Sequence, residues 1–438
     1  MSNSPSIARL ALLALAALSL GACASVPYMT DYTPPNIVQP ADGSRERLAL
    51  NAEVYDAAVR YVGRLFYDPD FGGVPFRAEA RARRAAAIAQ PTSEAFHGEL
   101  KQLLNLLGDG HTYTWTPQRR LRNAEQVAGA PFIGYGFFMT EYPDGWVVAT
   151  VAPGSAASEA GVLPGWRVES IAGRSVQLAD PAVAGRTDVI VFIDDVGARH
   201  SLSLEGIAMP PRTRFVARRL DGNIAYIRFD MFSQAEYDGY TAELKAFALD
   251  TPAGLIVDLR RNGGGAARAM GAMASQLYAD NQEQYVLGRE RHSVVWRGSP
   301  YLGPVVILMG PGSISAAEVF AGVAQEKGRA VIVGQTSHGS TVSPREIELP
   351  DGGILFVGSM EVTTPGGRRL EGVGVTPDII IPEDWQAIRE GRDPTLDAGI
   401  AALEAIMAPL PNSAQRTGTV ALVETGSPGA SGQASLGS

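Results

Sequence analysis

The sequence contains a single cysteine among 438 residues. One cysteine excludes a disulfide framework and any zinc or iron–sulfur site that needs several cysteines. Positive charge is also scarce, since 37 Lys and Arg stand against 46 Asp and Glu, which gives a net charge of −9. A nucleic-acid-binding domain is normally basic, so no nucleic-acid partner is expected. No clustered spacing of His, Cys and carboxylates is present, and we therefore expect neither a metal nor an organic cofactor.

Few residues could act as a catalytic base near neutral pH. The only lysines are Lys101, Lys245 and Lys327, and the five histidines are His97, His111, His200, His292 and His338. The remaining composition, 45% hydrophobic and 19% charged, is that of an ordinary globular protein. At about 150 residues per domain the chain has room for two or three domains.

The first residues have the pattern of an export signal. Arg9 precedes an apolar run from Leu10 to Leu20, which at about 11 residues is too short to span a bilayer as a helix. The run ends in Leu20-Gly21-Ala22-Cys23, which resembles the lipobox of bacterial lipoproteins. That resemblance implies a signal peptide over 1–22, a lipidated Cys23, a tether over 23–46, and anchoring at the outer membrane facing the periplasm of a Gram-negative bacterium. The alternative is an ordinary signal cleavage site near Cys23.

Hydrophobic periodicity and turn residues divide the rest of the chain into five segments. They are a helical region over 47–125, a β domain over 130–206, an α/β core over 212–385, a final helix over 394–408 and a disordered Gly/Ser-rich tail over 411–438. Within the core, strands are expected at 224–229, 255–259, 305–309, 330–333, 346–349 and 354–362, and helices at 237–248, 265–279 and 315–326. Strands that alternate with helices at this spacing are typical of an α/β fold.

The β segment resembles a PDZ domain over most of its length. In such a domain a Gly-x-Gly-Phe loop binds the carboxylate of a peptide C-terminus, and the peptide then adds as a strand to a sheet edge. Gly134, Tyr135, Gly136 and Phe137 match that loop, whereas Trp166 stands where an Asp usually follows the Pro-Gly. The alternative is a generic small β domain.

Ser315 follows an apolar strand and begins an amphipathic helix. A serine on such a sharp turn is exposed, and the helix N-terminus directs backbone N–H groups at whatever binds there. The segment Ser315-x-x-Glu318 is equally a capping box, which needs no catalysis. By itself this motif leaves a nucleophile and a helix cap as open alternatives.

Three further motifs contain candidate functional residues. Asn262-Gly263-Gly264-Gly265 could direct amides at an oxyanion or could form a simple tight turn. His111 lies on a glycine turn after a helix, and Glu371 lies on a glycine loop; locally, each could equally be structural or solvated.

Taken together and in order, the motifs resemble the tail-specific, or C-terminal-processing, serine peptidases, including the tricorn-like enzymes. They are Asp-Leu-Arg-x-Asn-x-Gly-Gly, Ser-x-Ser-Ala-x-Glu, Gly-Arg-Ala-Val-Ile-Val-Gly and Gly-Val-x-Pro-Asp, after a PDZ-like segment. The resemblance covers about 48–385. It implies a ClpP/crotonase-like α/β fold with an inserted PDZ-like domain, and cleavage of polypeptides near their C-termini. It also implies Ser315 as nucleophile and an oxyanion hole from Ala316 with Gly264 or Gly265.

The sequence departs from the common pattern of this family at the base. Many members pair the serine with a lysine 25 residues later, and that position holds Ser340. Lys327 cannot substitute, because twelve residues of helix separate it from Ser315 by about 18 Å. The tricorn-like branch uses a histidine and a glutamate instead, and His111 and Glu371 match them, although the relay serine of that branch aligns with Gly110. We therefore predict Ser315, His111 and Glu371 as the catalytic residues, with His338 as the alternative base.

Two other functions fit the same motifs. A peptide-binding scaffold would keep the PDZ groove and lack turnover, so it would bind C-terminal peptides without cleaving them. An esterase on the same core would act on small esters, for which a peptide-carboxylate site has no use. The PDZ-like segment argues against the esterase, whereas covalent reactivity at Ser315 that depends on His111 would distinguish a serine peptidase from the scaffold.

Overall fold

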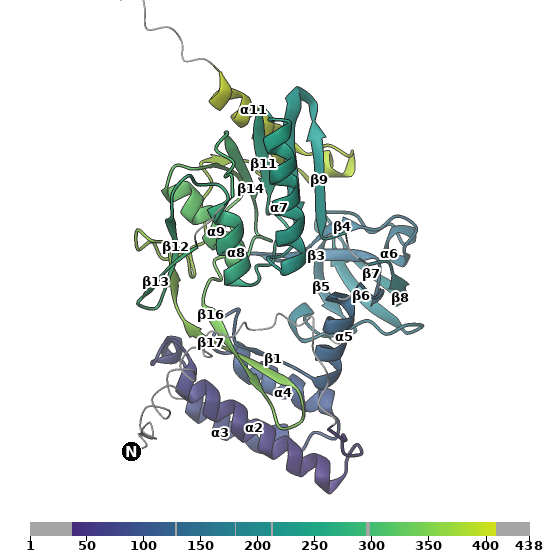
Figure 1. The fold of residues 1–438 in the computed structure, drawn as a ribbon. Coiled ribbons are helices and arrows are strands. Elements are labelled where there is room, and N and C mark those ends of the chain that lie inside the picture. Colours follow the sequence, from purple (N-terminus) through teal and green to yellow (C-terminus); the bar gives the residue numbers. More distant parts are fainter. Residues whose placement is uncertain (1–36, 128, 180, 212, 295–297, 409–438) are drawn as a thin grey trace, which may run out of the picture.

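The computed structural model describes residues 37–127, 129–179, 181–211, 213–294 and 298–408. The expected signal peptide, Cys23 and the tail over 411–438 lie outside these residues. A central α/β core carries a helical region at one end and a separate β domain at its side (Figure 1). Within the described ranges no helix is both long and apolar enough to cross a bilayer.

The core is built on a six-stranded sheet. Five strands are parallel to one another and β9 adds antiparallel at one edge. The spatial order is β19 (Ile379–Ile380), β15 (Val331–Gly334), β14 (Val305–Met309), β11 (Gly254–Asp258), β10 (Ile224–Phe229) and β9 (Phe215–Leu220). A parallel order of this kind confirms the α/β class that the alternating pattern predicts.

Both faces of the sheet are buried, so successive strand residues point into two different cores. On β10, Ala225 and Ile227 pack under helices α7 (Gln234–Leu249), α8 (Ala267–Ser275) and α9 (Ala316–Glu326). The alternate residues Ile224 and Tyr226 pack against α11 (Pro394–Met407) on the opposite face. Continuous apolar runs therefore form the strands here, as expected for parallel strands covered on both faces.

The helical region consists of α2 (Arg45–Leu65), α3 (Phe76–Ile88), α4 (Ser93–Asn105) and α5 (Pro117–Val127), with a 3-10 turn η1 (Phe71–Gly73). It joins the core through a small sheet in which β1 (Tyr113–Trp115) pairs antiparallel with β17 (Ile354–Met360), and β17 with β16 (Ser343–Glu348). Leu355 and Val357 of the hairpin lie in the same apolar cluster as the helices. The hairpin therefore locks the N-terminal region to the core.

The β domain contains a five-stranded antiparallel sheet. Its order is β3 (Phe137–Tyr142), β4 (Gly145–Val151), β5 (Arg167–Ile171), β6 (Thr187–Ile193) and β7 (Arg199–Glu205). The short helices α6 (Ala156–Glu159) and η2 (Val176–Leu178) complete it, and β2 (Phe132–Gly134) pairs with β8 (Ile207–Met209) where the chain enters and leaves the domain. Because β3 is an edge strand, one of its sides has no neighbouring strand in this sheet.

Two details of the core differ from the expected elements. The helix expected over 265–279 runs only from Ala267 to Ser275, because Gly264 and Gly265 hold positive φ angles before it. The hairpin β12 (Gln282–Leu287) and β13 (Glu290–Val294), which β18 (Val362–Thr363) joins, was not expected. The other short elements are η3 (Asp221–Asn223) and α10 (Trp385–Arg389).

A buried ion pair fastens α4 to the turn of the β16–β17 hairpin. Nε2 of His97 lies 2.8 Å from Oδ2 of Asp351, and both side chains are almost fully buried. Burial raises the pKa of Asp351, but the hydrogen bond and charge of His97 outweigh it and hold that pKa below its usual 3.8. A carboxyl whose folded pKa is depressed stabilises the native state above its unfolded pKa and loses that contribution as pH falls through the folded value.

The variant His97→Ala leaves this carboxylate buried without its partner, and we expect it to lower the free energy of unfolding by about 3–5 kcal/mol. Urea unfolding followed by circular dichroism measures the effect. Glu79→Ala is the matched control, because Glu79 pairs with Arg83 on the surface and its loss should cost less than about 1 kcal/mol. Equal effects of the two variants would contradict the assigned role of the buried pair.

Candidate active site

Ser315 lies on a sharp turn between β14 and α9. Its backbone has φ 60° and ψ −118°, which few residues other than glycine adopt. Such strain costs of order 1–3 kcal/mol and persists only where the surrounding structure enforces it. The turn makes Ser315 the N-cap of the helix, so the capping box that the motif suggests is present, and the strain is an additional feature that a cap does not require.

Glu318 holds this turn to two neighbouring loops. Its Oε2 accepts from the backbone N–H of Ser315 and of Ser340, both at 2.9 Å. Its Oε1 accepts from the Ser337 hydroxyl and from the N–H of Gly339, both at 2.6 Å. Burial raises the pKa of Glu318, and these four hydrogen bonds oppose the rise. One buried carboxylate thus brings position 340 next to the strained serine.

The glycine loop after β11 packs directly on Ser315. A Cβ on Gly264 would lie 2.7 Å from the Ser315 Cβ and 3.3 Å from the Ala316 nitrogen. The Gly264 N–H already donates to Oδ1 of Asn262 at 2.9 Å. Gly265 lies opposite Phe232 in an isolated parallel β-bridge. The hydrogen bonds of this bridge are made by the Gly264 carbonyl and the Ala266 N–H, so the N–H of Gly265 does not bond to Phe232. Of the amides expected to bind an oxyanion, Gly265 and Ala316 therefore fit better than Gly264.

Replacing Gly264 with Ala should abolish catalysis, because the new methyl group would collide with Ser315 and Ile314, and φ is +96° there. We expect kcat to fall at least about 100-fold, because a Cβ only 3.3 Å from the Ala316 nitrogen would displace that amide, and losing one oxyanion donor costs this much. Gly263→Ala is the matched control, since a Cβ at Gly263 meets nothing within 4 Å. Steady-state rates on one peptide substrate measure both variants, and equal activity of the two would refute this packing argument.

His111 lies on the turn between α4 and β1 and is buried. Its backbone N–H donates to Oδ1 of Asp109 at 2.8 Å, and its Nδ1 lies 4.0 Å from the same oxygen. The neighbouring Thr112 hydroxyl accepts from the N–H of Gly358 on β17, which attaches the turn to the hairpin. Burial lowers the pKa of His111, the nearby charge of His338 adds to this, and Asp109 and Glu371 oppose it. A lowered pKa keeps the imidazole neutral at pH 7, the form that a general base needs.

His338 is held by contacts on both ring nitrogens. Nδ1 lies 2.8 Å from the Ser340 hydroxyl, and Nε2 lies 3.6 Å from Oε2 of Glu141 on β3. The hydrogen bond to Glu141 raises the pKa of His338, burial opposes it, and Glu318 and Glu371 add to the rise. His338 is thereby favoured as a cation, which makes it a poorer base than His111.

Glu371 lies on the loop beside the Ser340 segment. Its Oε2 accepts from the N–H groups of Thr341 and Val342, the latter at 2.9 Å. It also lies close enough to His111 and His338 to influence both electrostatically. Glu371 thus lies near both histidines, and the hydrogen bonds of Glu318 connect the 337–340 loop to the Ser315 turn.

The lysines lie elsewhere. Nζ of Lys327, at the end of α9, donates to Gln282 at 3.1 Å. Lys101, on α4, donates to the carbonyl of Gln177 in the β domain. Lys245 lies within α7.

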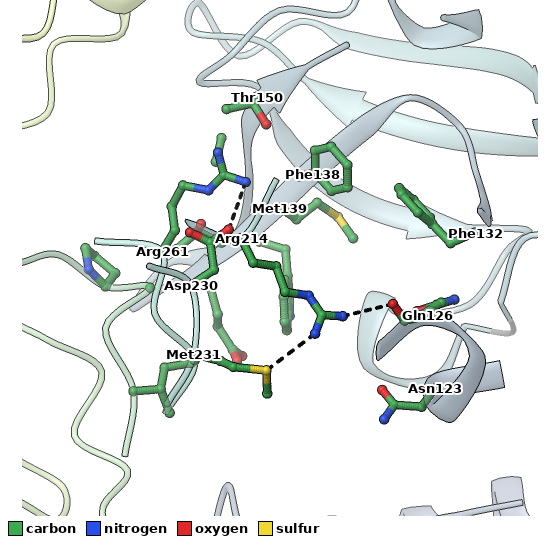
Figure 2. A pocket seen from close by; sticks show the side chains of 18 of the residues that line it. Asn123, Gln126, Phe132, Phe138, Met139, Thr150, Arg214, Asp230, Met231 and Arg261 are labelled. Carbon is green, nitrogen blue, oxygen red and sulfur yellow. Dashed lines mark hydrogen bonds and ion pairs between the residues drawn. The ribbon is translucent and has the colours of Figure 1, made fainter. Parts of the chain in front are cut away.

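A cavity of about 630 Å³ is lined by Ile314, which precedes Ser315, and by residues of β3 (Figure 2). Gly263, Gly312 and Ile314 line it on the catalytic side, and Met139 and Glu141 of β3 line it on the side of the β domain. Figure 2 shows Arg214 between the two halves, where it donates to the Gln126 carbonyl at 3.2 Å and contacts the Met231 sulfur at 3.6 Å. The cavity thus lies between the edge strand β3 and the loop that precedes Ser315.

The Gly134–Phe137 segment lies at the start of β3, where the expected carboxylate loop should be. Gly136 is pressed against Ser155, since a Cβ there would lie 2.0 Å from the Ser155 Cβ. The Tyr135 ring is buried, and its hydroxyl donates to Asp188 at 2.5 Å. Trp166, at the position that departs from the PDZ pattern, is stacked on His200 within the same domain.

Sequence reasoning missed several residues that build the site. Glu318 was considered only as a partner in the capping box, and Asp109, Ser337, Ser340 and Glu141 were not assigned a role. Glu318 and Glu141 contact distant segments, which no local pattern indicates. Asp109 instead bonds to His111 and Thr112 within its own turn, in the pattern of an ordinary turn residue. In the described residues no group of His, Cys and carboxylates is arranged to hold a metal ion.

A strained serine at a helix N-terminus, a facing glycine loop and a buried histidine are groups of the kind that serine-type hydrolases use. Residues 223–381 match the model of peptidase family S41. The relatives of this chain include carboxyl-terminal-processing peptidase 3, chloroplastic, of Arabidopsis thaliana, 28% identical over 342 residues, which are 72% of this chain and 66% of the relative. The carboxy-terminal-processing protease of Bartonella bacilliformis is 28% identical over 55% of this chain and 59% of its own length.

This chain thus spans about three fifths to two thirds of the length of these two curated relatives. Among solved structures, the photosystem II D1 C-terminal processing protease matches with a TM-score of 0.57 at 21% identity, over 78% of this chain and 96% of that one. That likeness confirms the mixed α/β fold with a helical N-terminal region.

Proposed function

We propose that this protein is a serine peptidase that hydrolyses peptide bonds of polypeptides near their C-termini through an acyl-enzyme on Ser315. The observation that carries the proposal is the strained Ser315 turn, which packs against Gly264 and whose Ile314 lines a cavity that reaches the β domain. The family match and the C-terminal-processing relatives support the same reaction class.

In the proposed reaction His111 acts as general base and then as general acid. His111 removes the proton of the Ser315 hydroxyl as Oγ attacks the substrate carbonyl carbon, and the amides of Ala316 and Gly265 bind the oxyanion. His111 then gives its proton to the leaving amine as the C–N bond breaks. Water, deprotonated by the same imidazole, hydrolyses the acyl-enzyme, and Glu371 orients the base.

The β domain is proposed to present the substrate in the manner of a PDZ domain. An extended peptide would pair with the open side of β3, and its carboxylate would meet the Gly134–Phe137 loop. The cavity between β3 and Ile314 gives such a peptide a route to Ser315. We further propose that the protein is exported and anchored to the periplasmic face of the outer membrane through Cys23.

Incubation of the purified protein with an unfolded polypeptide, read by mass spectrometry, tests the function. One arm uses a substrate with a free C-terminal carboxylate and the other the same substrate amidated at its C-terminus. We expect cleavage near the C-terminus, faster for the free acid. Binding of C-terminal peptides without any cleavage would replace the proposal with the scaffold function, and turnover of small esters alone would replace it with an esterase.

A further inference from the structure

A groove lies between α2 and α3, at the end of the molecule opposite α11 (Figure 1). It has a volume of about 410 Å³, and no described residue lines both this groove and the cavity beside Ile314. Residues three or four apart share one face of a helix. Arginines at this spacing on the two helices therefore line the groove together; they are Arg60 and Arg64 on α2, and Arg77, Arg81 and Arg84 on α3.

The groove is positive, although the chain as a whole has a net charge of −9. Asp56 is the only carboxylate among the described residues that line it, and Arg84 binds both of its oxygens at 2.8 Å. The hydrogen bonds of Arg84 lower the pKa of Asp56, burial opposes this, and the charge of Arg60 adds to the fall. The other four arginines pair with no carboxylate in the described ranges. Like charges gathered without a counter-charge favour binding of an anion.

The floor of the groove is apolar. Tyr55 and Ala80 are buried there, and the Tyr55 hydroxyl donates to the Ala80 carbonyl at 2.7 Å, so its polar atom is already satisfied. Val59 lies beside them, half-buried. The arginines that pair with no carboxylate are exposed and form the rim. A guanidinium rim over an apolar floor fits an anion whose phosphate is joined to hydrocarbon, because arginine binds phosphate oxygens in pairs.

The position of the groove in the chain favours a lipid over a soluble partner. Helix α2 begins at Arg45, which lies 22 residues after Cys23. An acylated Cys23, as proposed above, would keep α2 close to the bilayer. Phospholipid headgroups are then the anions that the groove meets at the highest local concentration. Basic pockets between helices are a known way of binding such headgroups.

We propose that the groove between α2 and α3 binds the headgroup of an anionic phospholipid and holds the helical region against the membrane surface. The arginine rim binds the phosphate, and the apolar floor contacts the glycerol and the first acyl carbons. This role is separate from the proposed peptidase activity. It fixes the orientation of the protein on the membrane, which a flexible tether by itself leaves free.

Vesicle flotation tests the proposal on the mature chain with Cys23→Ser, which carries neither an acyl chain nor the apolar run over 10–20. We expect binding to vesicles of phosphatidylcholine with phosphatidylglycerol, and little binding to vesicles of phosphatidylcholine alone. The double variant Arg64→Gln/Arg81→Gln should weaken binding roughly 20-fold, since each arginine near an anionic surface contributes about fivefold. Equal binding to both kinds of vesicle, or binding to neither, would overturn the proposal.

A matched variant separates the groove from attraction by net charge. Arg45→Gln/Arg83→Gln removes the same charge from the same two helices, at positions that do not line the groove. Arg83 is already paired with Glu79, and we expect this variant to keep most of the binding. Equal losses in the two double variants would overturn the proposal. Circular dichroism of each variant identifies any loss of binding that follows from misfolding.

Two competitors distinguish a lipid from other anions. Glycerol 3-phosphate lacks the acyl carbons that contact the floor, so it should displace the protein from vesicles only weakly. Complete displacement at equal phosphate concentration would indicate a site for soluble phosphate esters instead. Polyglutamate that displaced the protein more effectively than free lipid would indicate an acidic protein partner. Either result would overturn the proposal, whereas vesicle binding by a protein without peptidase turnover would refute only the peptidase function.

Discussion

Replacing Ser315 with Ala is expected to lower kcat by at least about 10⁴-fold, because removing a catalytic serine costs nearly all the rate that the site supplies. The loss should appear in kcat at unchanged KM, since the substrate cavity keeps its shape. Steady-state hydrolysis of a peptide, with intact-mass detection of an acyl-enzyme in the wild type, measures the effect. Residual turnover above a few per cent would mean that another residue is the nucleophile.

The backbone at position 315 supplies a control that is independent of substrate. Ala retains a Cβ and therefore the strain of φ 60°, whereas Ser315→Gly releases it. We expect Ser315→Gly to be as inactive as Ser315→Ala but more resistant to urea, by an amount of order the 1–3 kcal/mol that such strain stores. A less stable glycine variant would show that the turn is not strained.

Replacing His111 with Gln should reduce kcat by a similar factor of about 10⁴, because the serine hydroxyl then has no base. The corresponding His338→Gln should cost far less, since the contact with Glu141 raises the pKa of His338 and makes its neutral, basic form scarcer than that of His111. The lowered pKa of His111 sets the pH dependence. The base works only when neutral, so activity is lost as pH falls through the folded pKa, and the acidic limb should lie below pH 6.5.

The comparison of the two histidine variants decides between the two candidate bases. If His338→Gln abolished turnover and His111→Gln left it, the assignments would be reversed. If the acidic limb of wild-type kcat lay above pH 6.5, a neutral, buried His111 could not be the base. Measuring kcat from pH 4.5 to 8 with both variants provides all of these readings.

Several elements of the fold could be predicted from local patterns. The apolar runs at Ile224–Phe229 and Val305–Met309 form strands with the expected bounds, because a run buried on both faces is a strong local signal. The hairpin over 282–294 gave no such signal. The side chain of its buried Gln284 accepts a hydrogen bond from the N–H of Val294 at 2.7 Å. Because this contact is polar, hydrophobic periodicity cannot indicate it.

The identities of the candidate catalytic residues came from the order of the motifs, whereas their supporting residues did not. Glu318 shows why. In the sequence it is one member of a capping box, yet in the structure it accepts hydrogen bonds from the loop that carries Ser337, Gly339 and Ser340. That loop begins almost twenty residues later in the chain, so the spacing carries no information about it.

By itself, the sequence determined the α/β class of the core, the strand-to-helix turn at Ser315, the glycine loop that faces it and the short set of possible bases. Each of these depends on hydrophobic period, turn residues or residue counts, which are properties of a local segment. Only the tertiary structure decided how His111 reaches this core: β1 pairs with β17, a strand more than 200 residues away in the chain. The hydrogen bond from the Ser340 N–H to Glu318 was likewise decided there, because close packing between separate segments leaves no periodic pattern in either of them.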